Sequence, residues 1–428
     1  MFANSVSPIP ASPDPANAVQ TDTGTPAAGR GSRCRAGRAG RVGRVGRVGR
    51  VGRVGKLSWT AAIVAVVLAA PAAAFGIAGG FSATHGTKVP NAPQSTVGYK
   101  VGQHLTVGFH PAAGQALPAL TSDYDAYIAA AGGSEVLQVD VATGTILNAY
   151  AGADTTEGVA VTPDNSQVFI AETGQYDVTP VDVATGKEGT PIYVGAYPQD
   201  VATSPGGGTV YATVTSGDTG PGGSNVVAVI STSTDKVTGD VTVGSGPRQV
   251  VFSPDGSRAY VTTERSIDVI DTATSKVIDS IPDPAGPQGI AISPDGSTLY
   301  VTNPDAGSLL VINAASGRVT DRMPAGAEPY AVAVTPDGGT VYVTDMNSNS
   351  VMAIDTATHR SVATISVGSL PGAVAVTPDG SQVWVGNVLT GDITVINPAT
   401  NTVAGTLISG TGTSNLDGQP LGIAFVKS

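Results

Sequence analysis

The residues in this chain that could do chemistry are mostly carboxylates. Glu157 and Glu172 lie in one stretch of the sequence and Glu264 in a similar stretch further on, so a fold that repeats one unit could bring them toward one another. Two carboxyls that face each other can serve as general acid and general base, as they do in glycoside hydrolysis. The spacing alone does not establish that these three meet, so paired-carboxylate hydrolysis is one candidate chemistry.

Other catalytic chemistries lack the residues they need. The chain has four histidines and one cysteine, and only His359 falls in the repeated part of the sequence, in a turn expected opposite the carboxylates. The repeated part of the sequence therefore lacks most of the histidines and cysteines that a Ser-His-Asp triad, a zinc site or a thiolate cluster needs. The sequence also lacks G-x-S-x-G, H-E-x-x-H and a Gly-rich phosphate loop.

The elements that must position the carboxylates are repeats. The stretch SPDGSTLYVTN at 293–303 has close copies, whose turn prolines are Pro163, Pro205, Pro254, Pro294, Pro336 and Pro378. A period of about 40–45 residues in an all-β pattern is typical of a β-propeller with four strands per blade. We interpret the turn aspartates as structural, because Asp can bond its own backbone and the following Gly takes positive φ.

The two ends of the repeated region predict one further blade. Residues 126–150 contain a second, a third and an outer strand with no inner strand before them, and QPLGIAFV at 419–426 matches the inner strand GPQGIAIS. Pairing both ends in one blade would remove free sheet edges. We therefore predict an all-β, seven-bladed β-propeller over 121–428, closed by the C-terminal strand.

The repeats GIAISPDGSTLYVTN and AVAVTPDGGTVYVTD resemble the YVTN-type propeller repeat of seven-bladed surface-layer and periplasmic YncE-like proteins. The resemblance covers roughly 121–428 and implies the fold. It leaves function open, because propellers host many activities. The family that the chain resembles includes presumed surface proteins and a DNA-binding periplasmic protein. Lactonases of the 6-phosphogluconolactonase type are relatives of that family.

Ligands of propellers usually bind in a funnel at one end of the central channel, where inner strands begin and second strands end. By register, the predicted ligand-binding residues are Glu157, Glu172, Asp200, Arg248, Glu264, Gln288, Asn303, Glu328, Tyr330, Asp345 and Asn387. Six of them are carboxylates, so we expect a cation or a basic or polyhydroxylated ligand; the alternative is a solvated polar rim. We predict no catalytic residue, no metal ligand and no cofactor, a calcium ion in the funnel being the one candidate.

Three segments precede the propeller. Residues 1–56 form a basic, low-complexity leader that we expect to be disordered, 57–81 form an uncharged apolar helix, and 82–120 form a linker. The helix is long enough to cross a bilayer with its basic side cytoplasmic. Alternatively, it is a signal-peptide core cleaved near Ala74. Either interpretation places the propeller outside the cytoplasm.

Charge separates the leader from the rest. Residues 1–57 carry ten Lys and Arg against two Asp, whereas 58–428 carry twelve against thirty-one acidic residues, a balance of −19 that disfavours nucleic acid. We predict a monomeric, non-catalytic binding scaffold at a bacterial cell surface. Its partners would be a protein, a cell-envelope polymer or a small ligand, with membrane contact through 57–81. The alternative function is a lactonase-like or glycosidase-like hydrolase that uses the funnel carboxylates.

Overall fold

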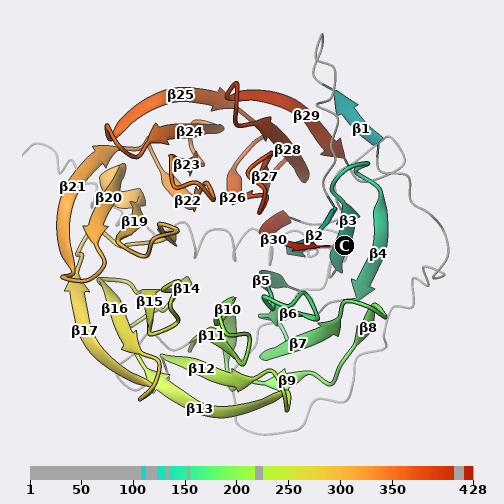
Figure 1. Ribbon diagram of the computed structural model, residues 1–428, viewed down its shortest axis with the longest axis vertical. Coiled ribbons are helices and arrows are strands. Elements are labelled where there is room, and N and C mark those ends of the chain that lie inside the picture. Colours follow the sequence, from blue (N-terminus) through green and yellow to red (C-terminus); the bar gives the residue numbers. More distant parts are fainter. Residues whose placement is uncertain are drawn as a thin grey trace, which may run out of the picture. The chain divides into compact units, whose positions relative to one another are not determined.

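The computed structural model describes residues 108–111, 123–131, 135–151, 155–216, 225–408 and 419–427. They form seven antiparallel sheets around a central axis (Figure 1), which confirms the predicted all-β, seven-bladed propeller. The predicted leader, the apolar helix 57–81 and most of the linker lie outside these residues. In the described part of the chain, no helix has the length and apolarity needed to cross a membrane.

Each blade has four strands, counted from the axis outward. The inner strands are β30 (Gln419–Lys427), β5 (Thr156–Val161), β10 (Tyr197–Thr203), β14 (Val250–Phe252), β18 (Ile290–Ile292), β22 (Pro329–Val334) and β26 (Pro371–Val376). The second strands are β2 (Tyr124–Ala131), β6 (Gln167–Glu172), β11 (Thr209–Thr215), β15 (Arg258–Thr262), β19 (Thr298–Asn303), β23 (Thr340–Asp345) and β27 (Val383–Asn387).

The two outer layers complete the blades. The third strands are β3 (Glu135–Asp140), β7 (Asp177–Asp182), β12 (Val226–Ser231), β16 (Ser266–Asp271), β20 (Ser308–Asn313), β24 (Ser350–Asp355) and β28 (Asp392–Asn397). The outer strands are β4 (Ile146–Ala151), β8 (Lys187–Glu188), β13 (Lys236–Thr242), β17 (Lys276–Pro282), β21 (Arg318–Pro324), β25 (Arg360–Ser366) and β29 (Thr402–Ile408). Two short strands are added, β9 (Ile192–Tyr193) beside β7 and β1 (Gly108–Pro111) beside β29. Among the described residues, one helical turn occurs, η2 (Pro304–Ala306).

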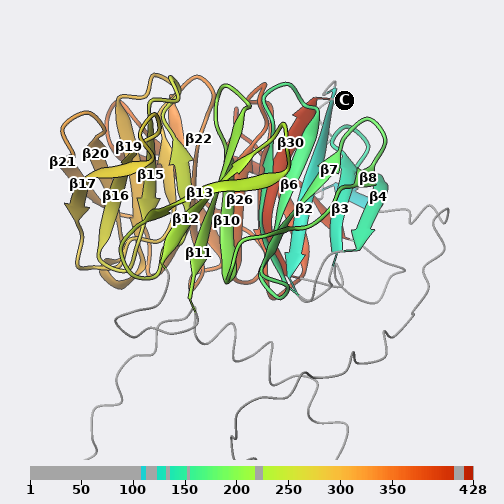
Figure 2. The same cartoon turned by 90° about the horizontal axis from the view of Figure 1, so that it is seen from below.

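The C-terminal strand closes the ring as predicted. β30 pairs antiparallel with β2 from Tyr124↔Lys427 to Ala131↔Gln419, so the first and last strands of the ring share one blade. Figure 1 shows β30, in red, beside β2, in blue-green, and Figure 2 shows the blades side-on. The similarity of 419–426 to the other inner strands therefore identified the closing strand correctly.

Packing between blades uses one aromatic side chain from each second strand. These side chains are at most 4% exposed, and they are Tyr127, Phe169, Tyr211, Tyr260, Tyr300, Tyr342 and Trp384. Tyr300, for example, packs with Val332 and Val343 of the next blade. Full burial of a large apolar side chain stabilises a fold by about 1.5–3 kcal/mol. The repeated aromatic position thus holds neighbouring blades together.

The turn aspartates bond their own turns. Asp255 Oδ1 accepts a hydrogen bond from the Ser257 N–H at 3.0 Å, and the preceding Ser253 hydroxyl donates to the same oxygen at 2.6 Å. The Ser253 hydroxyl is the main cause that lowers the pKa of Asp255 to about 2, and Gly256 has φ 71°. Asp295 makes the same contacts. These carboxylates are structural, as the sequence indicated.

Candidate functional site

Every inner strand carries a β-bulge at the same place, with two of its residues facing one residue of the second strand. In the blade of β14, for example, the Arg248 N–H donates to the Thr262 carbonyl at 2.8 Å, and the Thr262 N–H donates to the Gln249 carbonyl at 3.0 Å. The first residues of the seven bulges are Glu157, Gln199, Arg248, Gln288, Tyr330, Gly372 and Leu421. We call these residues the bulge ring.

Several polar residues of these bulges meet around the axis. The Arg248 guanidinium donates to the Gln288 Oε1 of the next blade. The charge of Glu157 raises the pKa of Tyr330, although two blades, those of β26 and β30, separate β5 from β22 along the shorter way round the ring. Groups so far apart along the ring can influence each other only if they point toward its axis. We call Glu157, Asp200, Arg248, Gln288 and Tyr330 the axial cluster.

Buried threonines fix the backbone of this cluster. The hydroxyls of three second-strand residues each donate to the carbonyl of a bulge residue in the next blade: Thr213 to Arg248 at 2.6 Å, Thr262 to Gln288 at 2.9 Å, and Thr302 to Tyr330 at 2.6 Å. The Thr302 hydroxyl also accepts the Gly289 N–H at 2.7 Å. Each hydroxyl therefore joins two neighbouring inner strands where the site residues emerge.

Glu157 and Asp200 form a pair of carboxyls on adjacent blades. Gly158 lets β5 and β10 approach closely, since a Cβ at this position would lie 2.7 Å from the Asp200 Cα. Burial raises the pKa of both carboxyls to about 7, and the charge of Asp200 contributes to the shift of Glu157. The Val250 N–H donates to Asp200 Oδ2 at 3.0 Å and opposes the shift of Asp200. At neutral pH the pair can therefore hold one proton between them.

Arg248 and Tyr330 bring a positive charge and a phenol to the same place. Burial lowers the pKa of Arg248, while Tyr330, Glu264 and Asp305 act in the opposite direction. Burial raises the pKa of Tyr330 to about 12, so its hydroxyl stays protonated at neutral pH. Apart from Gln288, which is buried, the side chains of the axial cluster remain partly exposed to solvent. A ligand reaching them would meet a base, an acid and a cation.

The structure places the other predicted residues elsewhere. Asn303 and Asn387 are fully buried, and Asp345 and Glu172 are at most 5% exposed, so they lie inside their blades. Two examples show their structural contacts: Asp345 accepts the N–H groups of 327 and 328 at 2.8 and 3.0 Å, and the Asn387 amide donates to Asp392 at 2.7 Å.

Glu328 and Glu264 lie beside the axial cluster. Glu328 is buried and lies two residues before Tyr330, the first bulge residue of its blade. Burial and the charges of Asp345 and Asp305 raise the pKa of Glu328. Glu264 is exposed and contributes its charge to Arg248. Sequence reasoning missed Asp305, in η2, which acts on the same guanidinium. Its position directly after the second strand β19 was the available signal.

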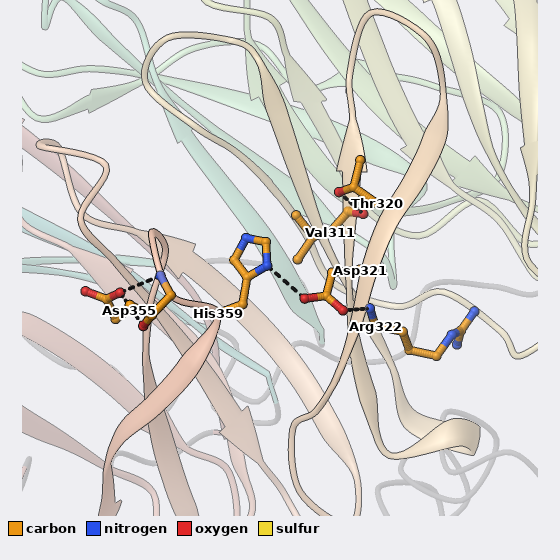
Figure 3. Close-up of polar contacts among 7 residues, drawn as sticks. Val311, Thr320, Asp321, Arg322, Asp355 and His359 are labelled. Carbon is orange, nitrogen blue, oxygen red and sulfur yellow. Dashed lines mark hydrogen bonds and ion pairs between the residues drawn. The ribbon is translucent and has the colours of Figure 1, made fainter.

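His359 is remote from the axial cluster. Its Nδ1 lies 2.8 Å from Asp321 Oδ2 on β21, in the only ion pair between two described residues (Figure 3). His359 occupies the turn between β24 and β25, and Asp321 lies on the outer strand of the preceding blade. The described residues also contain no group of three or more His, Cys, Asp or Glu arranged to hold a metal.

Comparisons with known proteins place the chain among propellers. Residues 226–377 match the family described as "Lactonase, 7-bladed beta-propeller". A hydrazine synthase of Kuenenia stuttgartiensis is 25% identical, with a TM-score of 0.57 over 62% of this chain and 90% of that one. No curated protein matches the sequence.

Two further similar structures are described as lactonases. The periplasmic gluconolactonase PpgL of Pseudomonas aeruginosa is 21% identical, with a TM-score of 0.58 over 71% of this chain and 99% of that one. A putative 6-phosphogluconolactonase of Bacteroides uniformis is 17% identical, with a TM-score of 0.58 over 71% and 100%. At these identities the likeness shows the fold alone.

These findings contradict the predicted non-catalytic scaffold. The family whose model matches residues 226–377 is described as a lactonase family. The prediction gave weight to the scarcity of histidine, whereas the axial cluster brings together two carboxyls, Glu157 and Asp200, whose pKa values are raised. The comparisons favour the alternative, a lactonase-like hydrolase.

Proposed function

We propose that this protein hydrolyses lactones at the axial cluster. The observation that carries the proposal is the Glu157–Asp200 pair, whose carboxyls both have a pKa of about 7 and lie in one cluster with Arg248. A catalytic acid or base works best with a pKa near the operating pH. The match of 226–377 to a lactonase family supports the same reaction class.

The side chains divide the steps of lactone opening among them. The Val250 N–H favours the ionised form of Asp200, so Asp200 takes the proton of the attacking water and Glu157 holds the shared proton. The water oxygen bonds to the carbonyl carbon, and Arg248 stabilises the negative charge that develops on the carbonyl oxygen. When the ring C–O bond breaks, Glu157 gives its proton to the departing oxygen.

Charge around the cluster favours a neutral lactone over a phosphorylated one. The axial cluster contains two carboxyls, Glu157 and Asp200, and one cation, Arg248, on which the carboxyls of Glu264 and Asp305 also act. A phosphate dianion would therefore be repelled. Neutral aldonolactones are the substrates we propose.

The test is hydrolysis of glucono-δ-lactone and simple aliphatic lactones by purified 82–428, followed by acid release above the spontaneous rate. Asp200→Asn and Arg248→Met should each lower kcat/KM by about 10²-fold or more. The control Asp240→Asn, an exposed carboxylate on β13, should not change it. Wild-type protein without turnover on any lactone would overturn the proposal.

The apolar segment 57–81 bears on where the protein is located in the cell. We propose that 57–81 either anchors the chain or directs its export, leaving the propeller outside the cytoplasm, because this stretch is uncharged and follows a basic leader. The repeat sequence supports a YVTN-type relationship within the propellers. Fractionation of cells that carry a C-terminal tag, with protease protection, tests the location.

A further inference from the structure

A second polar cluster lies inside the blade of β5 to β8. The ladder register sets Thr156 opposite Glu172, and Glu172 opposite Asp177. Thr179 follows two residues after Asp177 on β7, so its side chain lies on the same face. Residues directly opposite in an antiparallel pair also share a face, with Cβ atoms about 5 Å apart. One face of this blade therefore gathers two carboxyls and two hydroxyls.

The hydroxyls of this cluster lack partners. Thr156 is fully buried, and its Oγ1 makes no hydrogen bond to any described residue. Thr179 is 4% exposed and its Oγ1 is likewise unpaired, although it lies near enough to Glu172 to lower the pKa of that carboxyl. Asp177 Oδ1 is also buried and unpaired. Buried polar atoms in folded proteins nearly always have a partner, so a ligand that bonds these oxygens would stabilise this face of the blade.

The charges at the cluster are all negative. Glu172 is 5% exposed, and burial followed by contact with Asp177 raises its pKa to about 8. Glu188 adds further negative potential. The only ion pair between two described residues is the distant His359–Asp321 pair. Two adjacent carboxyls in such a place need either a proton or a cation.

We propose that Thr156, Glu172, Asp177 and Thr179 bind a calcium ion. Two carboxylates and two hydroxyls offer about six oxygen atoms, the ligand type and roughly the number that Ca²⁺ takes in flexible geometry. Mg²⁺ fits less well, because it demands a near-ideal octahedron and keeps most of its water. The site has only two acidic ligands, consistent with the absence of a larger acidic group among the described residues.

The proposed ion also affects the axial cluster. Thr156 directly precedes the bulge of β5, whose first residue is Glu157. A cation held by Thr156 would fix the start of this bulge and so the backbone that presents Glu157. This site is independent of the proposed lactonase activity, and its test does not need a substrate.

The experiment is terbium luminescence of the purified full-length protein, because Tb³⁺ replaces Ca²⁺ and Tyr176 directly precedes Asp177 and can sensitise its emission. We expect tyrosine-excited emission that Ca²⁺ displaces and Mg²⁺ displaces at least tenfold less well. Calcium should also raise Tm, since a ligand that binds only the folded state stabilises it.

Three variants make the assignment specific. Glu172→Gln should weaken calcium binding at least tenfold, and Thr179→Val, which keeps the side-chain shape, should weaken it severalfold. Asp240→Asn should bind as the wild type does. Absence of displaceable emission at millimolar calcium overturns the proposal, as does unchanged affinity in Glu172→Gln or equal affinity for Mg²⁺. Should Glu172→Gln fail to fold, Thr179→Val decides, and unchanged affinity in it overturns the site.

Discussion

Replacing Glu157 by Gln should abolish most of the activity and, at alkaline pH, make the protein more stable. Glu157 has a pKa of about 7 in the folded chain against an ordinary value of 4.5, and burial is the main cause. Below pH 4.5 the carboxyl is protonated in folded and unfolded chains alike. As the pH rises toward 7, the unfolded chain ionises first, so the free energy of unfolding falls.

The size of the effect follows from the shift in pKa. A shift from 4.5 to about 7, at 1.36 kcal/mol per unit, corresponds to about 3 kcal/mol above pH 7. Glu157 is partly exposed, so solvent reduces this to about 1–2 kcal/mol. For a domain of this size that is a rise in Tm of about 2–5 °C. Loss of the general acid should lower kcat by about 10²–10⁴-fold.

The assay compares Tm and lactone turnover of wild type and Glu157→Gln at pH 4 and pH 8.5. The two proteins should melt alike at pH 4, and the variant should melt higher at pH 8.5. The wild-type kcat/KM should form a bell centred near pH 7, and the variant should lose the alkaline limb. The reasoning is refuted if the difference in Tm is the same at both pH values, or if the variant keeps more than a third of the activity.

Three further predictions concern the framework. Thr302→Val should cost about 1–3 kcal/mol in urea unfolding, because it leaves the buried Gly289 N–H and Tyr330 carbonyl unpaired; an unchanged midpoint would contradict the bridging role. Deleting 419–428 removes β30 and opens the ring, so cooperative melting should be lost, whereas deleting 1–107 leaves every described strand and should leave Tm nearly unchanged; equal effects would contradict closure by β30. His359→Ala should change stability by less than about 1 kcal/mol in thermal unfolding between pH 5 and 8, because both side chains of its ion pair with Asp321 are partly exposed to solvent; a larger loss would show that this contact holds two blades together.

The fold could be predicted from the sequence because each blade of a propeller repeats the same pattern of strands and turns. Each blade has the same turn and the same aromatic position, so one blade interpreted correctly gives all the others. Closure could be predicted as well, since QPLGIAFV has no neighbouring blade of its own and residues 126–150 lack an inner strand. The short strand β1 was not identified at its observed position, because Gly108–Pro111 shows no alternation to mark it.

Register located part of the site and missed the rest. Glu157, Arg248, Gln288 and Tyr330 follow from the inner-strand pattern, because the bulge recurs at one position. On the C-terminal strand the structure puts Leu421 in the bulge ring, a residue that the predicted set does not contain. The signal was the Gly that follows the bulge residue, present in both Leu421-Gly422 and Gln288-Gly289.

The second-strand ends show what register cannot decide. Glu172 and Asn303 lie at the expected end of their blades, but their side chains are buried inside them. Which way such a side chain turns depends on its neighbours in the third strand. For Glu172 the neighbour is Asp177, which lies opposite it but five residues beyond the end of β6. Nothing in the order of the sequence indicated that Glu172 and Asp177 would lie side by side.

The bulge ring explains how equal blades can build an unequal site. Where blades pack, their residues agree in type, as the seven buried aromatic side chains show. At the bulges the side chains differ: Glu157, Arg248 and Tyr330 are polar, whereas the ring is completed on β26 and β30 by Gly372 and Leu421. A Cβ at 372 would lie 2.7 Å from Val388 Cγ2 and 3.1 Å from Leu421 Cδ2, so these two apolar side chains fill the space that the glycine leaves. The axis thus has a charged side and an apolar side, which would suit the polar ester group and the carbon ring of the lactones proposed as substrates.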